Sequence, residues 1–79
     1  MQNSKEKTLS QRITERIIKY ILDENLQPGA KLPNETLMCA RLKVGRSSLR
    51  EAMRALSSRN VITIRQGSGS YVSSTPRDN

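Results

Sequence analysis

The side chains with the clearest chemical potential in this 79-residue sequence are the basic ones between residues 41 and 65. A single acid, Glu51, accompanies them, so the segment carries a formal charge of 7 − 1 = +6, against +7 for the whole chain. The seven bases are Arg41, Lys43, Arg46, Arg50, Arg54, Arg59 and Arg65. Such a segment predicts a polyanionic partner, and charge alone does not separate a nucleic acid from an anionic membrane surface.

The residue types and spacing within this segment favour nucleic acid. Arg46, Arg50 and Arg54 recur at every fourth position, which places them on one side of a helix. Arginine can donate two hydrogen bonds to guanine O6 and N7, and serines such as Ser47 and Ser48 can bond to bases or phosphates. A merely solvated helix face is the alternative interpretation of the charge run.

The residue types that enzymes and metal sites need are scarce. The chain has no histidine and one cysteine, Cys39, so a finger-type zinc site with four Cys or His ligands is excluded. It has two aspartates and no glycine-rich loop opening a helix, so catalysis lacks its usual groups. We therefore expect no enzyme, no catalytic residue, no metal and no cofactor, and we interpret Cys39 as a packing residue.

Neither a membrane span nor a secretion signal is expected. No apolar run approaches the ~18 residues of a spanning helix. The N-terminal "MQNSKEKTLSQ" lacks the apolar stretch of a signal peptide. These patterns indicate a cytoplasmic protein with no membrane partner.

Three segments carry apolar residues at helical spacing. The first follows a capping-box pattern formed by Thr8 and Gln11. The second begins after Asn34, a good N-cap residue, and runs to Leu42, while the third covers residues 46–59. The side chains expected to be buried are Leu9, Ile13, Ile17, Ile18, Tyr20, Ile21, Leu22, Leu37, Met38, Leu42, Leu49, Ala52, Met53 and Leu56.

A β-hairpin is expected after the third helix. Residues 61–65 alternate and are β-branched, "QGSG" at 66–69 reads as a hairpin loop, and residues 70–73 form the returning strand. A helix, two helices joined by a three-residue break, and a hairpin predict an α+β, mainly α, winged helix-turn-helix. The expected organisation is a flexible tail (1–7), the winged helix-turn-helix (8–73) and a linker or frayed end (74–79).

The segment "KLPNETLMCARLKVGRSSLREAMRALSSRNVITIRQGSGSYV" resembles the N-terminal domain of GntR-type bacterial transcription regulators, most closely the fatty-acid-regulator-like (FadR-like) branch. "GRSSLREAMRAL" followed by "IRQGSGSYV" is a specific pairing of motifs. The resemblance implies sequence-specific binding of double-stranded DNA, with helix 46–59 in the major groove and the wing at 66–69 in the minor groove. The resemblance implies that Arg46, Ser47, Ser48 and Arg50 contact bases and phosphates, and that Gln66 and Gly67 enter the minor groove. Arg54, farther along the helix, is expected to contact the DNA backbone, and Thr36 is a further expected DNA-binding residue.

Two positions depart from the pattern of the family that the sequence resembles. Thr36 stands where many members have arginine, so a DNA contact often made there differs in this chain. Lys43 stands where glycine is usual in the break between the second and third helices. A positive φ at that position would cost lysine about 1 kcal/mol.

The resemblance also implies partners that these residues cannot supply. Family members continue into a larger helical domain that dimerises and binds a small-molecule effector, so we expect a homodimer on a palindromic operator. The ending "STPRDN" favours an excised DNA-binding domain over a chain without an effector switch. Repression and activation both stay open, and a winged helix for protein contacts is the main alternative function.

The first prediction concerns salt. If each copy neutralises four to five phosphates, the plot of log K against log salt for a duplex should have a slope of about −4. Titrations of the chain against a duplex at several salt concentrations measure this slope. A flat response would contradict the electrostatic interpretation of residues 41–65.

Overall fold

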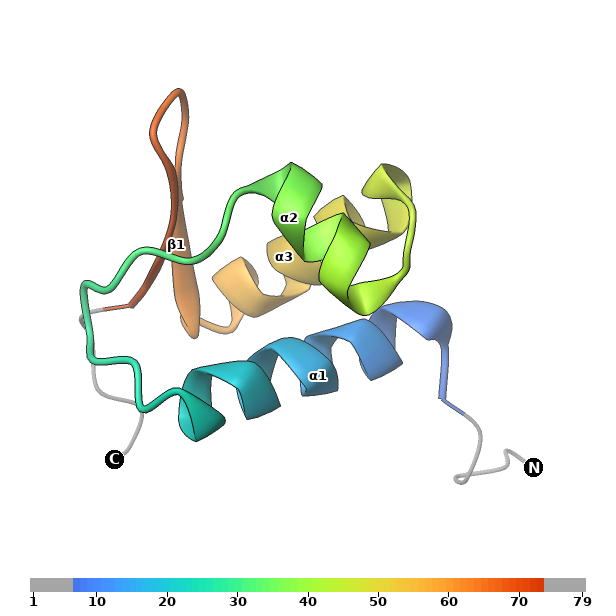
Figure 1. The fold of residues 1–79 in the computed structure, drawn as a ribbon, viewed down its shortest axis with the longest axis horizontal. Helices are drawn as coiled ribbons and strands as arrows, with labels where there is room; N and C mark the ends of the chain where they lie inside the picture. The colour runs from blue at the N-terminus through green and yellow to red at the C-terminus, as the bar shows by residue number, and fades with distance from the viewer. Residues whose placement is uncertain (1–6, 74–79) are drawn as a thin grey trace.

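The computed structural model describes residues 7–73, which form three helices followed by a two-stranded antiparallel hairpin (Figure 1). The elements are α1 (Leu9–Asp23), α2 (Glu35–Leu42), α3 (Arg46–Ser58), β1 (Ile62–Arg65) and β2 (Gly69–Val72). This is the predicted winged helix-turn-helix, in which the hairpin is the wing. The predicted tail and linker lie outside the described residues, apart from Lys7.

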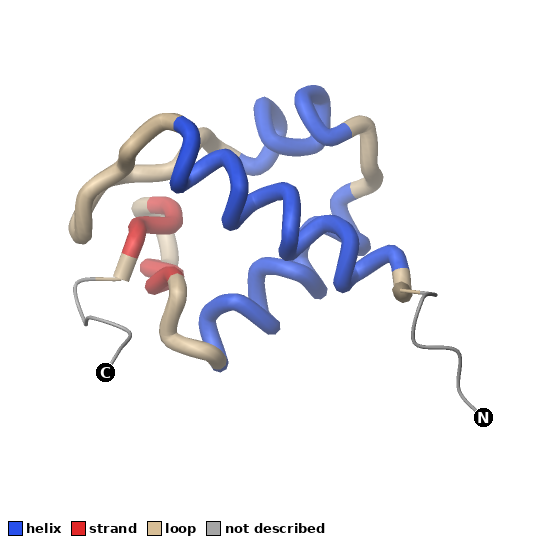
Figure 2. Tube along the Cα trace, turned by 90° about the horizontal axis from the view of Figure 1, so that it is seen from below, coloured by secondary structure: helices blue, strands red, loops and turns tan. Residues whose placement is uncertain are grey.

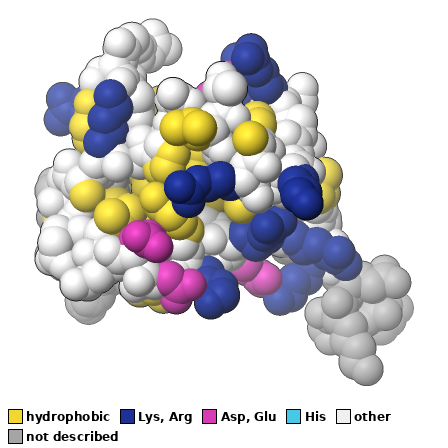
Figure 3. All heavy atoms as spheres, viewed as in Figure 1, with side chains coloured by type: hydrophobic (Ala, Val, Ile, Leu, Met, Phe, Trp, Pro, Cys, Tyr) yellow, Lys and Arg dark blue, Asp and Glu magenta, His cyan; other side chains and the backbone are white. Residues whose placement is uncertain are grey.

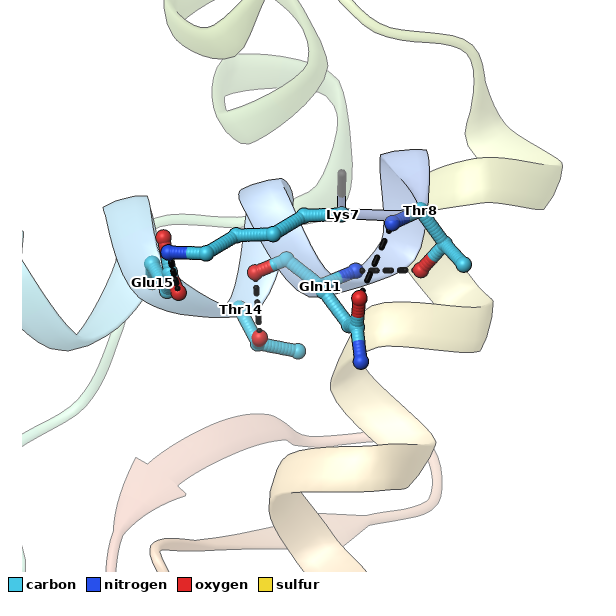
Figure 4. Close-up of polar contacts among 5 residues, drawn as sticks. All are labelled: Lys7, Thr8, Gln11, Thr14 and Glu15. Atoms are coloured by element: carbon cyan, nitrogen blue, oxygen red, sulfur yellow. Dashed lines mark hydrogen bonds and ion pairs between the residues drawn. The ribbon is translucent and has the colours of Figure 1, made fainter. Parts of the chain in front are cut away.

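The N-terminus of α1 has the capping box expected from its sequence (Figure 4). Thr8 Oγ1 accepts a hydrogen bond from the backbone N–H of Gln11 at 3.0 Å, and Gln11 Oε1 accepts one from the Thr8 N–H at 2.9 Å. Lys7 Nζ also donates to Glu15 Oε2 at 2.6 Å. The capping box satisfies amides that the first turn of a helix leaves without partners, and so determines where α1 begins.

The turn between α2 and α3 is three residues long, as predicted. The Asn34 side chain starts α2 by accepting from the Leu37 N–H at 2.8 Å. Lys43 ends α2 with φ +58° and ψ +50°, so the positive φ considered for this lysine is present. This left-handed residue reverses the chain sharply enough for α3 to begin at Arg46.

One small core joins α1, α2, α3 and the root of the wing. α1 packs against α3 (Figures 1 and 2), and the buried apolar side chains of both helices belong to one cluster. The buried apolar side chains are Ile13, Ile17, Ile21, Leu32, Met38, Leu49, Ala52, Met53, Leu56 and Ile62. The predicted inner face of α3 is therefore confirmed in full.

The expected burial of Leu9, Leu22 and Leu37 is wrong. Leu22 is 72% exposed and Leu37 is 52% exposed, and Leu9 in the first turn of α1 is also exposed. Leu22 lies about 140° around the helix from the buried Ile17, because successive residues are about 100° apart. Among the described residues, no element covers that side of α1, so the helix buries only one face.

The wing differs from its prediction by one residue at each strand. β1 starts at Ile62 instead of Val61, and β2 covers Gly69–Val72, so the loop is residues 66–68. The Ser68 N–H donates to the Arg65 carbonyl at 3.0 Å and closes a four-residue turn. Gly69 can therefore pair with Arg65 as the first residue of the returning strand.

A loop segment from before α2 pairs with the outer edge of β2. The Leu32 N–H donates to the Ser70 carbonyl, and the Val72 N–H donates to the Ala30 carbonyl, both at 2.8 Å. Lys31 forms an isolated antiparallel bridge with Tyr71. The wing is thereby attached to the loop between α1 and α2, as well as to α3.

The second prediction concerns Lys43. The variant Lys43→Gly should raise the free energy of unfolding by about 1 kcal/mol, because glycine adopts a positive φ without the steric cost. Chemical denaturation followed by circular dichroism measures the change.

Lys43→Ala is the matched control. It removes the same charge but keeps a Cβ, so it should not stabilise the protein. Equal stabilisation by both variants would mean that charge at residue 43, rather than its backbone conformation, sets the cost.

Candidate nucleic-acid interface

The outer side of α3 presents the predicted recognition residues to solvent. Arg46, Ser47, Arg50 and Arg54 are exposed, and Ser48 is half-buried. The N-cap residue Gly45 has no side chain to occupy the first amides of the helix. A helix N-terminus with free amides attracts anions such as phosphate, so both the side chains and the backbone suit a nucleic acid.

A groove of about 460 Å³ runs between the helix-turn-helix and the wing. Arg50 and Arg54 line it from α3, and Gln66 lines it from the wing. The structure thus brings these three predicted residues together. Arg46, Ser47, Ser48, Thr36 and Gly67 do not line this groove, although all but Ser48 are exposed.

Charge is unevenly distributed over the face drawn in Figure 3. Separate basic side chains lie over the wing and the helix-turn-helix, and a further group lies at the lower right, over α1, where acidic side chains also occur. This agrees with the sequence, in which α1 carries charges of both signs while residues 41–65 are net basic. The net positive charge of residues 41–65, which form the end of α2, α3 and the first strand of the wing, would attract a polyanion to this part of the surface.

Glu35, which was not predicted as a site residue, binds the predicted recognition arginines. Its Oε2 accepts from Arg50 Nε at 2.7 Å and its Oε1 accepts from Arg50 Nη2 at 3.3 Å, while Arg46 Nε lies 3.9 Å from Oε1. The hydrogen bond from Arg50, aided by the charges of Arg50 and Arg46, lowers the pKa of Glu35. The same hydrogen bond and the charge of Glu35 raise the pKa of Arg50.

A sequence signal for Glu35 existed. It is the only acid between residues 25 and 50, and it begins the helix that precedes the basic one. An isolated acid beside a cluster of arginines is a natural partner for them. The pairing was not predicted because Glu35 lies fifteen residues before Arg50. Spacing within one helix predicts contacts between residues three or four apart, and it predicts none at this separation.

Two further bases that were not predicted as contacts lie at the wing, Arg65 on β1 and Lys31 in the loop before α2. The Arg65 guanidinium lies over the Tyr71 ring at 5.6 Å, and the Tyr71 hydroxyl is 2.5 Å from Ser68 Oγ. The Lys31 side chain crosses the hairpin at Gly69, where Cε lies 3.0 Å from the position a Cβ would take. Arg65 on β1 therefore supplies a base of the wing itself, and Lys31 adds a second base beside β2 from the loop before α2.

Two other arginines, Arg16 and Arg41, form contacts between α1 and α2. The Arg41 guanidinium lies 5.4 Å from the centre of the Tyr20 ring of α1. Arg16 Nη1 donates to the Leu42 carbonyl at 3.1 Å, at the end of α2. Arg41 was counted in the basic segment, but its contact ties α2 to α1.

Within residues 7–73, no three His, Cys, Asp or Glu side chains lie where they could share a metal ion. No helix in this range is long and apolar enough to cross a bilayer.

One known protein family matches most of the chain. The family described as "Bacterial regulatory proteins, gntR family" matches residues 9–72. This range contains every predicted site residue and all five elements.

The curated relatives include both a repressor and a transcriptional activator. The chain is 39% identical over 64 residues to a putative L-lactate dehydrogenase operon regulatory protein of Escherichia coli, covering 81% of this chain and 25% of that protein. It is 36% identical to the E. coli mannosyl-D-glycerate system repressor (84% and 28%) and 38% identical to the E. coli Glc operon transcriptional activator (76% and 24%). The chain thus spans about a quarter of the length of these relatives.

Solved structures share the fold. A possible transcriptional regulator, YydK of Bacillus subtilis, superposes with a TM-score of 0.84 at 29% identity, over 91% of this chain and 32% of that one. A Streptococcus agalactiae GntR protein gives 0.78 at 46% identity, over 82% and 32%. The DNA-binding domain of AraR, solved with operator ORX1, gives 0.80 at 24% identity, over 91% and 87%, and shows the same fold.

The third prediction concerns the wing tip. Gly67 has φ +78° and open space around its Cα, so Gly67→Asn keeps a residue that tolerates this conformation but adds a side chain. The variant should change the free energy of unfolding by less than ~1 kcal/mol and weaken duplex binding about tenfold, or ~1.4 kcal/mol. Thermal melting and titration with a duplex selected from a random pool measure the two effects.

Gly29→Asn is the matched control for the wing tip. Gly29 also has a positive φ, +91°, and open space, but it lies at the root of the wing, where its N–H donates to Val72. It should leave duplex binding unchanged. Unaltered binding by Gly67→Asn would mean that the tip does not approach DNA.

Proposed function

Because the chain belongs to the GntR family of bacterial regulatory proteins, we propose that α3 enters the major groove of operator DNA while the wing follows the minor groove. The chain is the DNA-binding domain of a regulator in this family, which is not a family of enzymes. The observation that carries the proposed docking is the groove between α3 and the wing, lined by Arg50, Arg54 and Gln66.

The residues of α3 divide by their position along the helix. Arg46, Ser47, Ser48 and Arg50 occupy the first turns, which reach base edges when a recognition helix enters the major groove. Arg54 lies further along and binds the phosphate backbone. Thr36, exposed near the start of α2, supplies a hydroxyl to a phosphate where many relatives place arginine.

The wing contributes Gln66 and Gly67 at the minor groove. Both residues are exposed at the tip, and the absence of a side chain at Gly67 leaves room for close approach. Arg65 and Lys31 flank the tip and add positive charge, which favours the negative potential of the minor groove and its phosphates.

The proposed regulator is longer than this chain. The chain spans about a quarter of its relatives' length, which supports a longer regulator in which another domain pairs two copies on a palindromic operator and binds a small-molecule effector. The motif "GRSSLREAMRAL" and the L-lactate and Glc operon relatives support the FadR-like branch. A regulator of chromosomal DNA acts in the cytoplasm, and its relatives include both a repressor and an activator.

The fourth prediction tests the recognition helix. Arg46→Ala and Arg50→Ala should each weaken binding to a selected duplex by ~1–3 kcal/mol and relax base preference at one position. Titration combined with selection of duplexes from a random pool gives both quantities.

Arg12→Ala and Lys19→Ala are the controls for this experiment. Both side chains are exposed on α1, which carries charges of both signs. These variants should change affinity little and leave base preference intact. Equal losses from all four variants would mean that bulk charge, and not the surface of α3, determines binding.

A further inference from the structure

We infer that Glu35 is a specificity-determining positioning residue, which orients Arg50 so that the free end of its guanidinium points at a base. The inference rests on the proposed function, in which Arg50 contacts a base edge. Glu35 belongs to α2 and Arg50 to α3, so the pair couples the two helices of the helix-turn-helix at the DNA-facing surface.

The geometry leaves the end of the guanidinium available. Glu35 accepts from Arg50 Nε at 2.7 Å and from Nη2 at 3.3 Å, so its carboxylate occupies the side edge of the group. A guanidinium has five N–H donors, and two of them are used here. The remaining donors include both hydrogens of Nη1 and one of Nη2, and a bidentate contact to guanine O6 and N7 needs two.

The pair also restricts a side chain that would otherwise move freely. The Arg50 side chain is 59% exposed, and no other side chain in residues 7–73 forms a hydrogen bond or ion pair with it. Glu35 is better anchored, because its side chain is only 35% exposed and it lies in the first turn of α2, next to the N-cap Asn34. An anchored carboxylate therefore limits the rotamers from which Arg50 can reach DNA.

The charge of Glu35 acts differently on specific and on non-specific binding. It lies between Arg50 and Arg46, the latter at 3.9 Å, so three charged groups carry a net charge of 2 − 1 = +1. A phosphate attracted to these arginines meets the carboxylate as well, which weakens sequence-independent binding. A base edge is neutral, so the Glu35 carboxylate weakens its contact with the oriented guanidinium less than it weakens a phosphate contact.

Protonation does not interrupt this arrangement near neutral pH. The hydrogen bond from Arg50, followed by the charges of Arg50 and Arg46, lowers the pKa of the Glu35 carboxyl from its ordinary value. Glu35 therefore stays ionised under the conditions of a binding experiment, and its carboxylate can hold Arg50 throughout.

The experiment compares Glu35→Gln, Glu35→Asp and Arg50→Ala in the 79-residue chain. Each variant is titrated with a selected duplex and with an unrelated duplex, and base preference is measured by selection from a random pool. Glu35→Gln should lower the ratio of specific to non-specific affinity about tenfold, at the same base position as Arg50→Ala, and should tighten non-specific binding. Glu35→Asp keeps the charge but is one methylene shorter, so it should lose the specificity without the gain in non-specific affinity.

Glu51→Gln is the matched control, because it removes one exposed acid from α3 that has no hydrogen bond or ion pair within residues 7–73. It should tighten binding to both duplexes equally and leave base preference unchanged. Thermal melting of every variant shows whether the fold is retained.

Three results would overturn the inference. Glu35→Gln could behave like Glu51→Gln, which would make Glu35 only a surface charge. It could alter preference at a different base position from Arg50→Ala, which would make Glu35 a direct reader of that base. Unchanged preference in Arg50→Ala would instead remove Arg50 from the proposed function, and the inference would fall with it.

Discussion

The structure depends on the burial of one face of α3 against α1. Leu49 and Leu56 are at most 1% exposed, as are Ile13 and Ile17 of α1. Turning α3 by one residue, about 100°, would bring polar or charged side chains into a core that offers no partners for them. Because this face cannot rotate, the arginines of α3 are held on the outer side, and the surface that meets DNA follows from the core.

The other elements complete that surface from a distance. α2 brings Glu35 within 2.7 Å of Arg50, and the loop before α2 pairs with the wing and brings Lys31 to Gly69. A chain with no Phe or Trp and a small core thus uses backbone pairing to hold the wing in place. The backbone pairing that attaches the wing to the loop before α2 therefore also places the positive charge of Lys31 beside the wing.

Not all of the basic charge has the same use. Arg41 and Arg16 contact a ring of α1 and a carbonyl of α2, so they stabilise the arrangement of the helices. Arg46 and Arg50 share one acid, and Arg65 lies over Tyr71. The formal charge of residues 41–65 therefore overstates the charge free to bind phosphate.

The sequence by itself determined which elements form and where the helices begin, while the ends of the wing strands differed from the prediction by one residue. The caps at Thr8 and Asn34 depend on groups close together in the chain, and the inner face of α3 depends on helical spacing alone. The tertiary structure decided which apolar residues are covered and which charges meet. Leu22 and Leu37 have helical spacing but no neighbour to cover them, and Glu35 meets Arg50 only because the turn at Lys43 folds α2 against α3. The burial of a side chain and an ion pair between two helices both depend on which element packs against the helix. The spacing of residues within one helix carries no information about that neighbouring element.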